Sequence, residues 1–393
     1  MTVNGDVDRV ANAAARPRRD LAVLVGNGLS IAYNPELALP SLTKALLERI
    51  AEMPGGGSEA VAAMKQIAER ALPGGASTDG DFETLVGAFG AEGATMRYLS
   101  NLAAIVVPGD EELAIALNRV AAFATKVRDL GISYVLEVIF ERSRAQHDRA
   151  QRLFELCRAI VGEFAGNVAF GNLNYDTLLL SALLEACGGE LADMGHGYRK
   201  VRVSVESETY TVPALRRAAV DFPKDRRVQL LHLHGSLTYW ADPEKDIYAK
   251  FDTNFLRTYG LWKAVREGEV DERPVVVLAN QRDKSDHVKD YPFSLAYQMF
   301  EGRLASANHW LIIGYSFRDS CVNERVRAAF AEREAGEKPR VMVATYGTSP
   351  TTREVERALG WGAEDGDSSG WLTVFRDGAD ALRESSAWAA FNS

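Results

Sequence analysis

The feature that most constrains the fold is a series of short apolar segments separated by stretches with helical spacing. Continuous apolar strands of this length are typical of a parallel sheet whose two faces are both covered by helices. The segments that we interpret as strands, the last of them less apolar than the others, are Leu21–Val25, Asn167–Phe170, Val228–Leu233, Pro274–Leu278, Trp310–Ile313, Val341–Ala344 and Trp371–Phe375.

Helices are predicted between most of these strands, at residues 177–186, 294–307 and 320–334. Alternation of strands and helices along a chain favours an α/β fold. We therefore predict a Rossmann-like, doubly wound parallel sheet.

The segment between the first and second strands breaks this alternation, because residues 43–165 contain no convincing strand. One apolar stripe at helical spacing consists of Leu39, Leu42, Leu46, Leu47 and Ile50. Further helices are predicted around 113–123 and 135–139, with glycine-rich breaks at 55–58 and 74–77.

These observations predict a large helical insertion after the first strand, which covers the crevice beside that strand. The Rossmann-like domain would comprise residues 21–42 and 166–393, and the helical insertion module residues 43–165. Residues 1–20 are polar and predict a disordered leader rather than a signal peptide.

Charge and cysteine content exclude several classes of protein. A net charge of −9 argues against direct nucleic-acid binding. The three cysteines are widely separated and form no CxxC pair, which excludes a zinc ribbon and fits a reducing cytoplasm. No apolar run approaches the roughly 18 residues of a membrane span.

A glycine turn, Gly26–Ser30 (GNGLS), follows the first strand. It is either a plain turn into a helix or a phosphate-binding turn, in which glycine allows close approach and Ser30 caps the helix or binds phosphate. A classical dehydrogenase is disfavoured, because Ile31 replaces the third glycine of its motif and Glu48 lies on a predicted helix.

Polar residues also follow the second and third strands. Asn174 and Asp176 could cap the next helix, but capping does not explain both together with Asn172. His234 offers a proton acceptor near neutral pH, and Gly235 leaves room for a ligand.

The alternatives for this histidine pair are a buried structural residue or an HxH metal site that includes His232. Because no third ligand is apparent, we predict no metal and a structural role for His232. The turn Gly314–Asp319 follows the fifth strand and either contacts a nucleotide or caps a helix. Asp81–Glu83 is expected to cap a helix, and the loop 280–292 with Lys284 is expected to be a solvated surface.

Taken in order, the motifs GNGLS, NYD, HGS and GYSF resemble the sirtuin superfamily. They are most similar to its bacterial NAD-hydrolysing branch, whose members serve as effectors of anti-phage defence. The resemblance implies that His234 is a general base, that Asn174 positions the nicotinamide ribose and a water, and that Asp176 binds the carboxamide. The residues that it implies for binding NAD are Gly26, Asn27, Gly28, Ser30, Gly235, Gly314 and Ser316.

The sequence departs from deacetylating sirtuins at several points. Leu173 stands where they carry Gln, their adenosine-ribose Asn is replaced near Thr345, and the zinc-binding four-cysteine module is missing. The resemblance therefore implies an NAD glycohydrolase that releases nicotinamide and ADP-ribose without a metal. The alternatives are an NAD-dependent protein deacylase, a cyclase, and a non-catalytic sensor of NAD or ADP-ribose.

The resemblance also bears on partners. Related defence effectors form homo-oligomers or join a partner such as a HerA-type ATPase or an Argonaute-like protein. We expect a homo-oligomer or such a partner, and the acidic charge of this chain suits a partner that handles nucleic acid.

Overall fold

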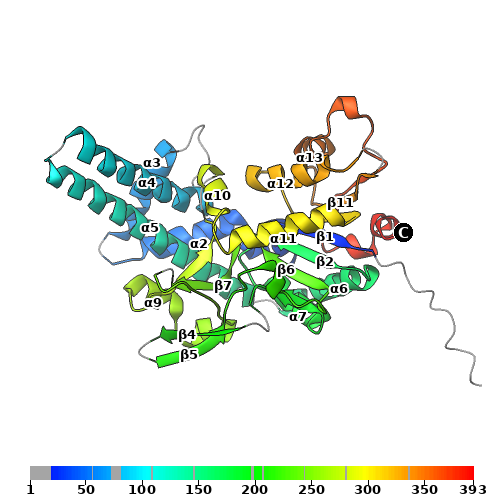
Figure 1. The fold of residues 1–393 in the computed structure, drawn as a ribbon, viewed down its shortest axis with the longest axis horizontal. Helices are drawn as coiled ribbons and strands as arrows, with labels where there is room; N and C mark the ends of the chain where they lie inside the picture. Colours follow the sequence, from blue (N-terminus) through cyan, green and yellow to red (C-terminus); the bar gives the residue numbers. More distant parts are fainter. Residues whose placement is uncertain are drawn as a thin grey trace, which may run out of the picture.

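Figure 1 shows the structure, a computed structural model. It describes residues 19–393 except 55, 72–80, 108, 145–146, 196–198, 206–207, 243, 279–280 and 335–336. The predicted leader, apart from its last two residues, and the predicted break at 74–77 lie outside the described residues.

A seven-stranded sheet forms the centre of the molecule, in the order β12-β11-β10-β1-β2-β6-β3. Every neighbouring pair in this sheet is parallel. The strands are β1 (Leu21–Val25), β2 (Val168–Asn172), β3 (Leu191–Asp193), β6 (Val228–His232), β10 (His309–Ile313), β11 (Arg340–Ala344) and β12 (Leu372–Phe375). The predicted Rossmann-like fold is confirmed.

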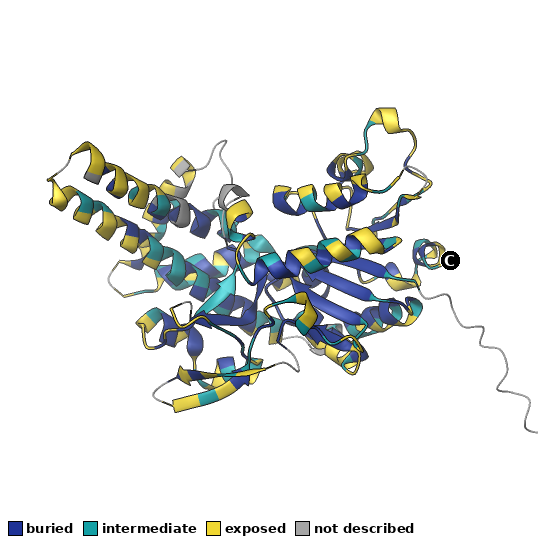
Figure 2. Ribbon diagram, viewed as in Figure 1, coloured by how far each residue is buried: buried dark blue, intermediate teal, exposed yellow. Residues whose placement is uncertain are grey.

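Helices cover both faces of this sheet because successive residues of each buried strand point to opposite sides. Leu24, Leu231 and Trp310 face a core with α11 (Phe293–Ser306), α12 (Ser320–Ala331) and α13 (Thr352–Leu359). Val23, Leu230 and Leu311 face α1 (Asn27–Tyr33), α6 (His147–Glu163), α7 (Leu178–Cys187) and α14 (Ser386–Phe391). Figure 2 shows the strands of the sheet as buried. The three helices predicted between strands are confirmed, with small shifts at their ends.

A third hydrophobic core lies beside the sheet and contains Leu46, Val86, Leu136, Trp240 and Trp262. Its helices are α2 (Leu39–Ala51), α3 (Gly57–Ala71), α4 (Phe82–Val106), α5 (Glu111–Arg144), α8 (Thr253–Thr258) and α9 (Leu261–Glu267). Its strands are β4 (Lys200–Val205), β5 (Glu208–Pro213), β7 (Gly235–Asp242), β8 (Ile247–Lys250) and β9 (Arg273–Val276).

Within the described part of residues 43–165 the structure contains helices and no strand, as predicted. The two helices predicted around 113–123 and 135–139 are wrong in one respect, because they are parts of the single helix α5. No proline interrupts α5, and Gly131 within it faces α4, where a Cβ would lie 2.8 Å from Val86. That glycine serves close helix packing and does not end the helix.

The expected strand at Pro274–Leu278 was assigned to the wrong sheet. It forms β9, which pairs antiparallel with β7 in a three-stranded sheet of order β8-β7-β9. An apolar composition indicates that a strand is buried, but it does not indicate which strand it pairs with. Because β9 is an edge strand, it tolerates the missing N–H of Pro274. The seventh place in the central sheet belongs instead to β3, whose three residues are too short to give a sequence signal.

The strand order places a topological switch point at β1. The chain passes from β1 to β2 and β6 on one side, and β10, β11 and β12 follow on the other side. Open α/β sheets bind ligands beyond the carboxyl ends of the strands at such a point.

At this switch point the backbone of the first turn of α1 contacts the loop after β10. The N–H of Gly28 donates to the carbonyl of Gly314 over 2.8 Å, and a Cβ at Gly28 would lie 2.6 Å from Gly314 Cα. Gly314 also has a φ of +62°, which favours glycine. By contrast, Gly26 has a φ of −111°, so glycine is needed there for space and not for a left-handed backbone.

We predict that Gly28→Ala destabilises the protein by about 1–3 kcal/mol, because the added methyl group overpacks a backbone contact that cannot shift easily. Urea unfolding measures the change. Gly189→Ala is the matched control, since a Cβ at Gly189 would meet nothing within 4 Å. Equal stability of the two variants would contradict the prediction.

Candidate functional site

A cavity of about 520 Å³ opens at the switch point, between the carboxyl ends of the central strands and the helical segment. This volume is in the range typical of small-molecule sites. Eight of the ten site residues predicted from the sequence line it: Gly26, Asn27, Gly28, Asn174, Asp176, His234, Gly314 and Ser316.

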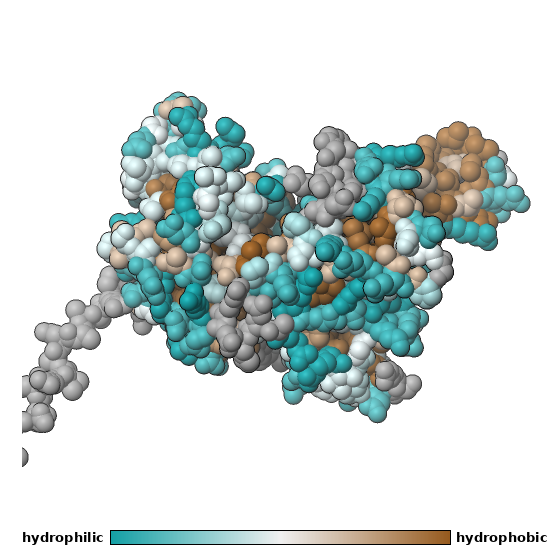
Figure 3. Space-filling view, turned by 180° about the vertical axis from the view of Figure 1, so that it is seen from behind, coloured by the Kyte–Doolittle hydropathy of each residue, from teal (hydrophilic) through white to brown (hydrophobic). Residues whose placement is uncertain are grey.

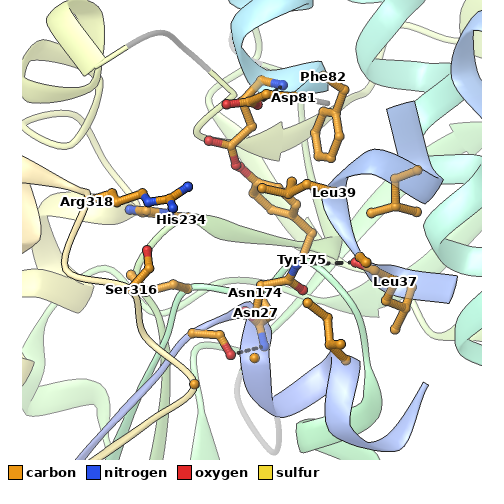
Figure 4. Close-up of a pocket in the computed structure, with 18 of the residues that line it drawn as sticks. Asn27, Leu37, Leu39, Asp81, Phe82, Asn174, Tyr175, His234, Ser316 and Arg318 are labelled. Carbon is orange, nitrogen blue, oxygen red and sulfur yellow. Dashed lines mark hydrogen bonds between the residues drawn. The ribbon is translucent and has the colours of Figure 1, made fainter. Parts of the chain in front are cut away.

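The opposite wall of the cavity consists of residues just before the helical insertion, such as Leu37 and Leu39, and of Phe82 and Ile139 within it. Figure 4 shows His234, Ser316 and Arg318 on one side and Leu37, Leu39 and Phe82 on the other. The expectation that this segment covers the crevice agrees with these positions.

Ser30, Asn174 and Asp176 form one buried hydrogen-bond network at the carboxyl ends of β1 and β2. The Ser30 hydroxyl donates to Asp176 Oδ2 over 2.6 Å, and Asn174 Nδ2 lies 2.9 Å from Ser30 Oγ and 3.1 Å from the carbonyl oxygen of Gly26. Ser30 therefore orients the two polar side chains from behind the cavity. Because both amide hydrogens of Asn174 have acceptors, its carbonyl oxygen is the group that can accept a hydrogen bond from a water.

Asp176 has two roles that the sequence left as alternatives. Its Oδ1 accepts from the N–H of Leu178 at the start of α7, and the residue also lines the cavity. Burial raises the pKa of this carboxyl group above its usual value, although the hydrogen bonds from Ser30 and Leu178 oppose the shift.

Asn27 and Gly235 have structural contacts of their own. Asn27 Nδ2 donates to the carbonyl of Leu37 over 3.2 Å, so it ties α1 to the segment that follows it. Gly235 is not part of the cavity lining. Its φ is +84°, and a Cβ there would lie 2.1 Å from the carbonyl oxygen of Val275. This glycine lets the chain turn from β6 into β7, next to His234.

The imidazole of His234 is buried and electrically neutral. Its side chain is 5% exposed, and its Nε2 lies 3.6 Å from Asp319 Oδ2, beyond hydrogen-bond distance. Burial, together with the positive charge of Lys284, lowers the pKa of His234 to about 4 against the opposing effect of Asp319 and Glu83. A neutral imidazole whose Nε2 has no hydrogen-bond partner within the described residues can accept a proton.

Three charged side chains beside His234 were not identified as site residues from the sequence. Lys284 Nζ, on α10 (Gln281–His287), lies 2.8 Å from Glu83 Oε2 and 3.3 Å from Asp319 Oδ2. Burial disfavours the charged lysine, but the two carboxylates raise the pKa of Lys284 above its usual value. Burial also works to raise the pKa of Asp319, but His234 and Lys284 lower it.

The prediction of a solvated loop at 280–292 is therefore wrong for Lys284, which is 7% exposed. Capping was correctly predicted for Asp81, which accepts from the N–H groups of Glu83 and Thr84. Asp319 likewise caps α12 by accepting from Val322. No local pattern distinguishes these caps from ordinary ones, because the ion pairs join segments that are far apart in the sequence.

The loop after β10 has an unusual backbone. Phe317 has a φ of +57°, which is rare for a residue with a side chain and marks local strain. Asn323 Nδ2 donates to the carbonyl of Phe317, and Tyr315 Oη donates to Asn323 Oδ1. Asn323 thus supports the loop that brings Ser316 and Arg318 to the cavity.

His232 has the structural role predicted for it. It is 1% exposed, and its Nδ1 lies 3.3 Å from Asn172 Nδ2. Across the described residues, no group of three or more His, Cys, Asp or Glu side chains is placed to hold a metal ion. Of the helices that the structure describes, none combines the length and apolar character needed to cross a bilayer.

Comparison with known proteins shows similarity to one domain family. A model described as a SIR2-like domain matches residues 169–363, which include Asn174, Asp176, His234 and Ser316. A structure of Sir2 in complex with the inhibitor EX-527, 2'-O-acetyl-ADP-ribose and deacetylated p53-peptide is similar over 61% of this chain and 72% of that chain, with 10% sequence identity and a TM-score of 0.33. No curated protein matches the sequence. The domain match supports a place in the sirtuin-like superfamily and, at that level, an enzyme that uses NAD.

The lowered pKa of His234 can be tested by NMR titration. Because the pKa lies near 4, below the ordinary 6.5, His234 should stay neutral from pH 8 to pH 5 in histidine-selective NMR spectra, with His234→Asn providing the assignment. Lys284→Met removes a charge that lowers this pKa and keeps the carboxylates that raise it, so the pKa should increase. A wild-type pKa near 6.5, or no increase in Lys284→Met, would contradict this account.

Proposed function

We propose that the protein is an NAD⁺ glycohydrolase, which cleaves NAD⁺ to nicotinamide and ADP-ribose. The observation that carries the proposal is the convergence of a neutral buried imidazole, His234, and a fixed carboxamide, Asn174, on one cavity at the switch point of the sheet. The resemblance to sirtuins supplies NAD as the substrate that fits these groups.

The chemistry requires little help for the leaving group. Nicotinamide departs as a neutral pyridine when its bond to the anomeric carbon of the ribose breaks, and the ribose becomes oxocarbenium-like. A water oxygen then bonds to that carbon, and its proton must be removed. Asn174 would orient the water through its carbonyl oxygen, and His234 would take the proton directly or through a ribose hydroxyl.

The other polar residues of the cavity would position the substrate. Asp176 would accept a hydrogen bond from the nicotinamide carboxamide, and its contact with Ser30 keeps the carboxylate oriented. The close backbone approach of Gly26, Gly28 and Gly314 leaves that edge of the cavity without side chains, which suits contact with the pyrophosphate and adenosine ribose.

Hydrolysis is favoured over protein deacylation by the cysteine positions. Cys157, Cys187 and Cys321 are free and buried, so they cannot build the four-cysteine zinc module that supports the acyl-peptide cleft of deacetylating sirtuins. The helical segment forms part of one wall of the cavity.

Replacement of the proposed base should impair turnover without unfolding the protein. We predict that His234→Ala lowers the rate of NAD consumption by about 10²- to 10⁴-fold, the usual contribution of general base catalysis. Asn174→Ala should also be strongly impaired. The measurement is release of nicotinamide and ADP-ribose, followed by mass spectrometry, with circular dichroism as the test of folding.

His287→Ala is the matched control, because His287 lies on α10 close in sequence to Lys284 but does not line the cavity. This variant should consume NAD at the wild-type rate. Normal NAD consumption by folded His234→Ala and Asn174→Ala proteins would refute the assignment.

The same assay distinguishes a glycohydrolase from the alternative functions. A glycohydrolase should release nicotinamide without any acyl-lysine peptide and give linear ADP-ribose. Release that depends on an acyl-lysine peptide would identify a deacylase, cyclic ADP-ribose a cyclase, and binding without any product a sensor.

We further propose that this activity serves anti-phage defence by abortive infection, because unrestrained NAD loss would stop growth of the host cell. A HerA-type ATPase or an Argonaute-like protein remains the proposed type of partner. We expect cellular NAD to fall after phage infection in cells with the wild-type chain and not in cells with His234→Ala. Equal NAD levels in the two strains would refute the defence role while leaving the enzymatic assignment to the assay above.

A further inference from the structure

An exposed apolar surface covers the outer ends of α4 and α5. Among the described residues, ten of the fourteen exposed large apolar side chains lie there. They are Tyr98, Leu99, Leu102, Ile105, Val106, Val107, Leu113, Ile115, Val120 and Phe123, with exposures from 40% to 76%. Figure 3 shows the surface as a brown area at the right end of the molecule. Patches of this extent on a protein surface usually mark an interaction site.

The spacing of these residues is that of helices that pack against other helices. Leu99, Leu102 and Val106 on α4 follow a three-then-four spacing. Leu113, Ala116, Val120 and Phe123 on α5 continue as three, four and three, which is the heptad pattern of a coiled-coil seam. A neighbouring face of α5, roughly a quarter turn away, has Ala121 and Ala124 buried and packs against α4. The seam on α5 therefore has capacity for a further helix.

We propose that this surface binds a second copy of the same chain, with the two α5 helices antiparallel about a two-fold axis near residue 118. This two-fold rotation places the apolar row of one α5 against the same row of the other. Leu113 of one copy meets Phe123 of the other, and Ala116 meets Val120. A two-fold axis repeats each contact, so one complementary pattern produces the whole interface.

The charges beside the seam fit the same arrangement. Glu112, Arg119 and Lys126 are exposed and recur every seven residues along one flank of α5. In an antiparallel pair, Glu112 of each copy lies opposite Lys126 of the other, which gives two symmetric ion pairs, while the two Arg119 side chains flank the axis. Within one chain these two residues are about 21 Å apart along the helix and cannot meet.

The end of the hairpin is acidic, with Asp110, Glu111 and Glu112 all exposed. Three carboxylates at the leading tip oppose insertion into an anionic membrane surface, so the charge favours a protein occupant. The apolar area is also sufficient. Ten side chains exposed by about half supply on the order of 800 Å² per copy, which is the share of each partner in a stable interface.

Analytical ultracentrifugation of the full chain tests the proposal. The wild type should sediment as a dimer and Val120→Asp as a monomer with an unchanged circular dichroism spectrum. Glu112→Lys and Lys126→Glu should each weaken dimerisation by about tenfold through two like-charge contacts. The double variant Glu112→Lys/Lys126→Glu should return to nearly the wild-type dissociation constant, since it restores both ion pairs with reversed sign.

Val220→Asp is the control, because Val220 is 87% exposed and lies outside the hairpin; this variant should remain a dimer. A monomeric wild type, including one that binds anionic lipid vesicles, would overturn the proposal. So would a Val120→Asp protein that keeps the wild-type assembly, or a double variant no stronger than the single variants. None of these outcomes depends on whether the protein hydrolyses NAD.

Discussion

Direct backbone contact between the loops after β1 and β10 is the constraint on which the site depends. β1 and β10 are neighbouring parallel strands, with Val25 paired to Ile313, so the segments that follow them start side by side. The helices that follow the two strands then lie on opposite faces of the sheet. Gly28 and Gly314 meet at distances that no side chain permits. The same loop fixes the network behind the cavity, because Asn174 donates to the carbonyl of Gly26 and to Ser30. These glycines therefore have two effects: they allow the backbone contact, and they line the cavity without adding side chains to it.

The second constraint is electrostatic and joins the core that contains α4 to the core that contains α12. Lys284 lies between Glu83, at the start of α4, and Asp319, at the start of α12. A buried lysine is stable only with such partners, since desolvation of one unpaired charge costs several kcal/mol. With its charge maintained, Lys284 opposes protonation of His234. The ion pairs thus connect the helical segment to the sheet and keep the imidazole in its neutral form.

The sequence predicted those parts of the structure that local patterns encode. Buried strands such as Val341–Ala344 and turns that follow strands, such as Asn174–Asp176, have a signal within a few residues, and the sheet then brings the turns together. Contacts between distant segments have no such signal. Lys284 lies in a polar stretch that predicts a solvated loop, and Glu83 lies in a segment that predicts a helix cap. Pro274–Leu278 has the right composition for a strand, but composition does not specify the sheet. Gly26 was predicted for close approach of a ligand and lines the cavity, but its contact with the backbone of Gly314 had no signal in the sequence.

One helix connects the cavity with the apolar surface at the far end of the molecule. Phe82, at the start of α4, lines the cavity, and Val106, at its end, is part of the exposed surface. Helix α4 has 25 residues and is about 37 Å long. Its packing on α5 through small residues such as Gly93 and Gly131 holds the two helices close together along much of their length. A helix fixed at its outer end by a second copy has less freedom at its inner end, where Glu83 holds Lys284 beside His234. The helical segment therefore links the proposed dimer surface to the surroundings of the His234 imidazole.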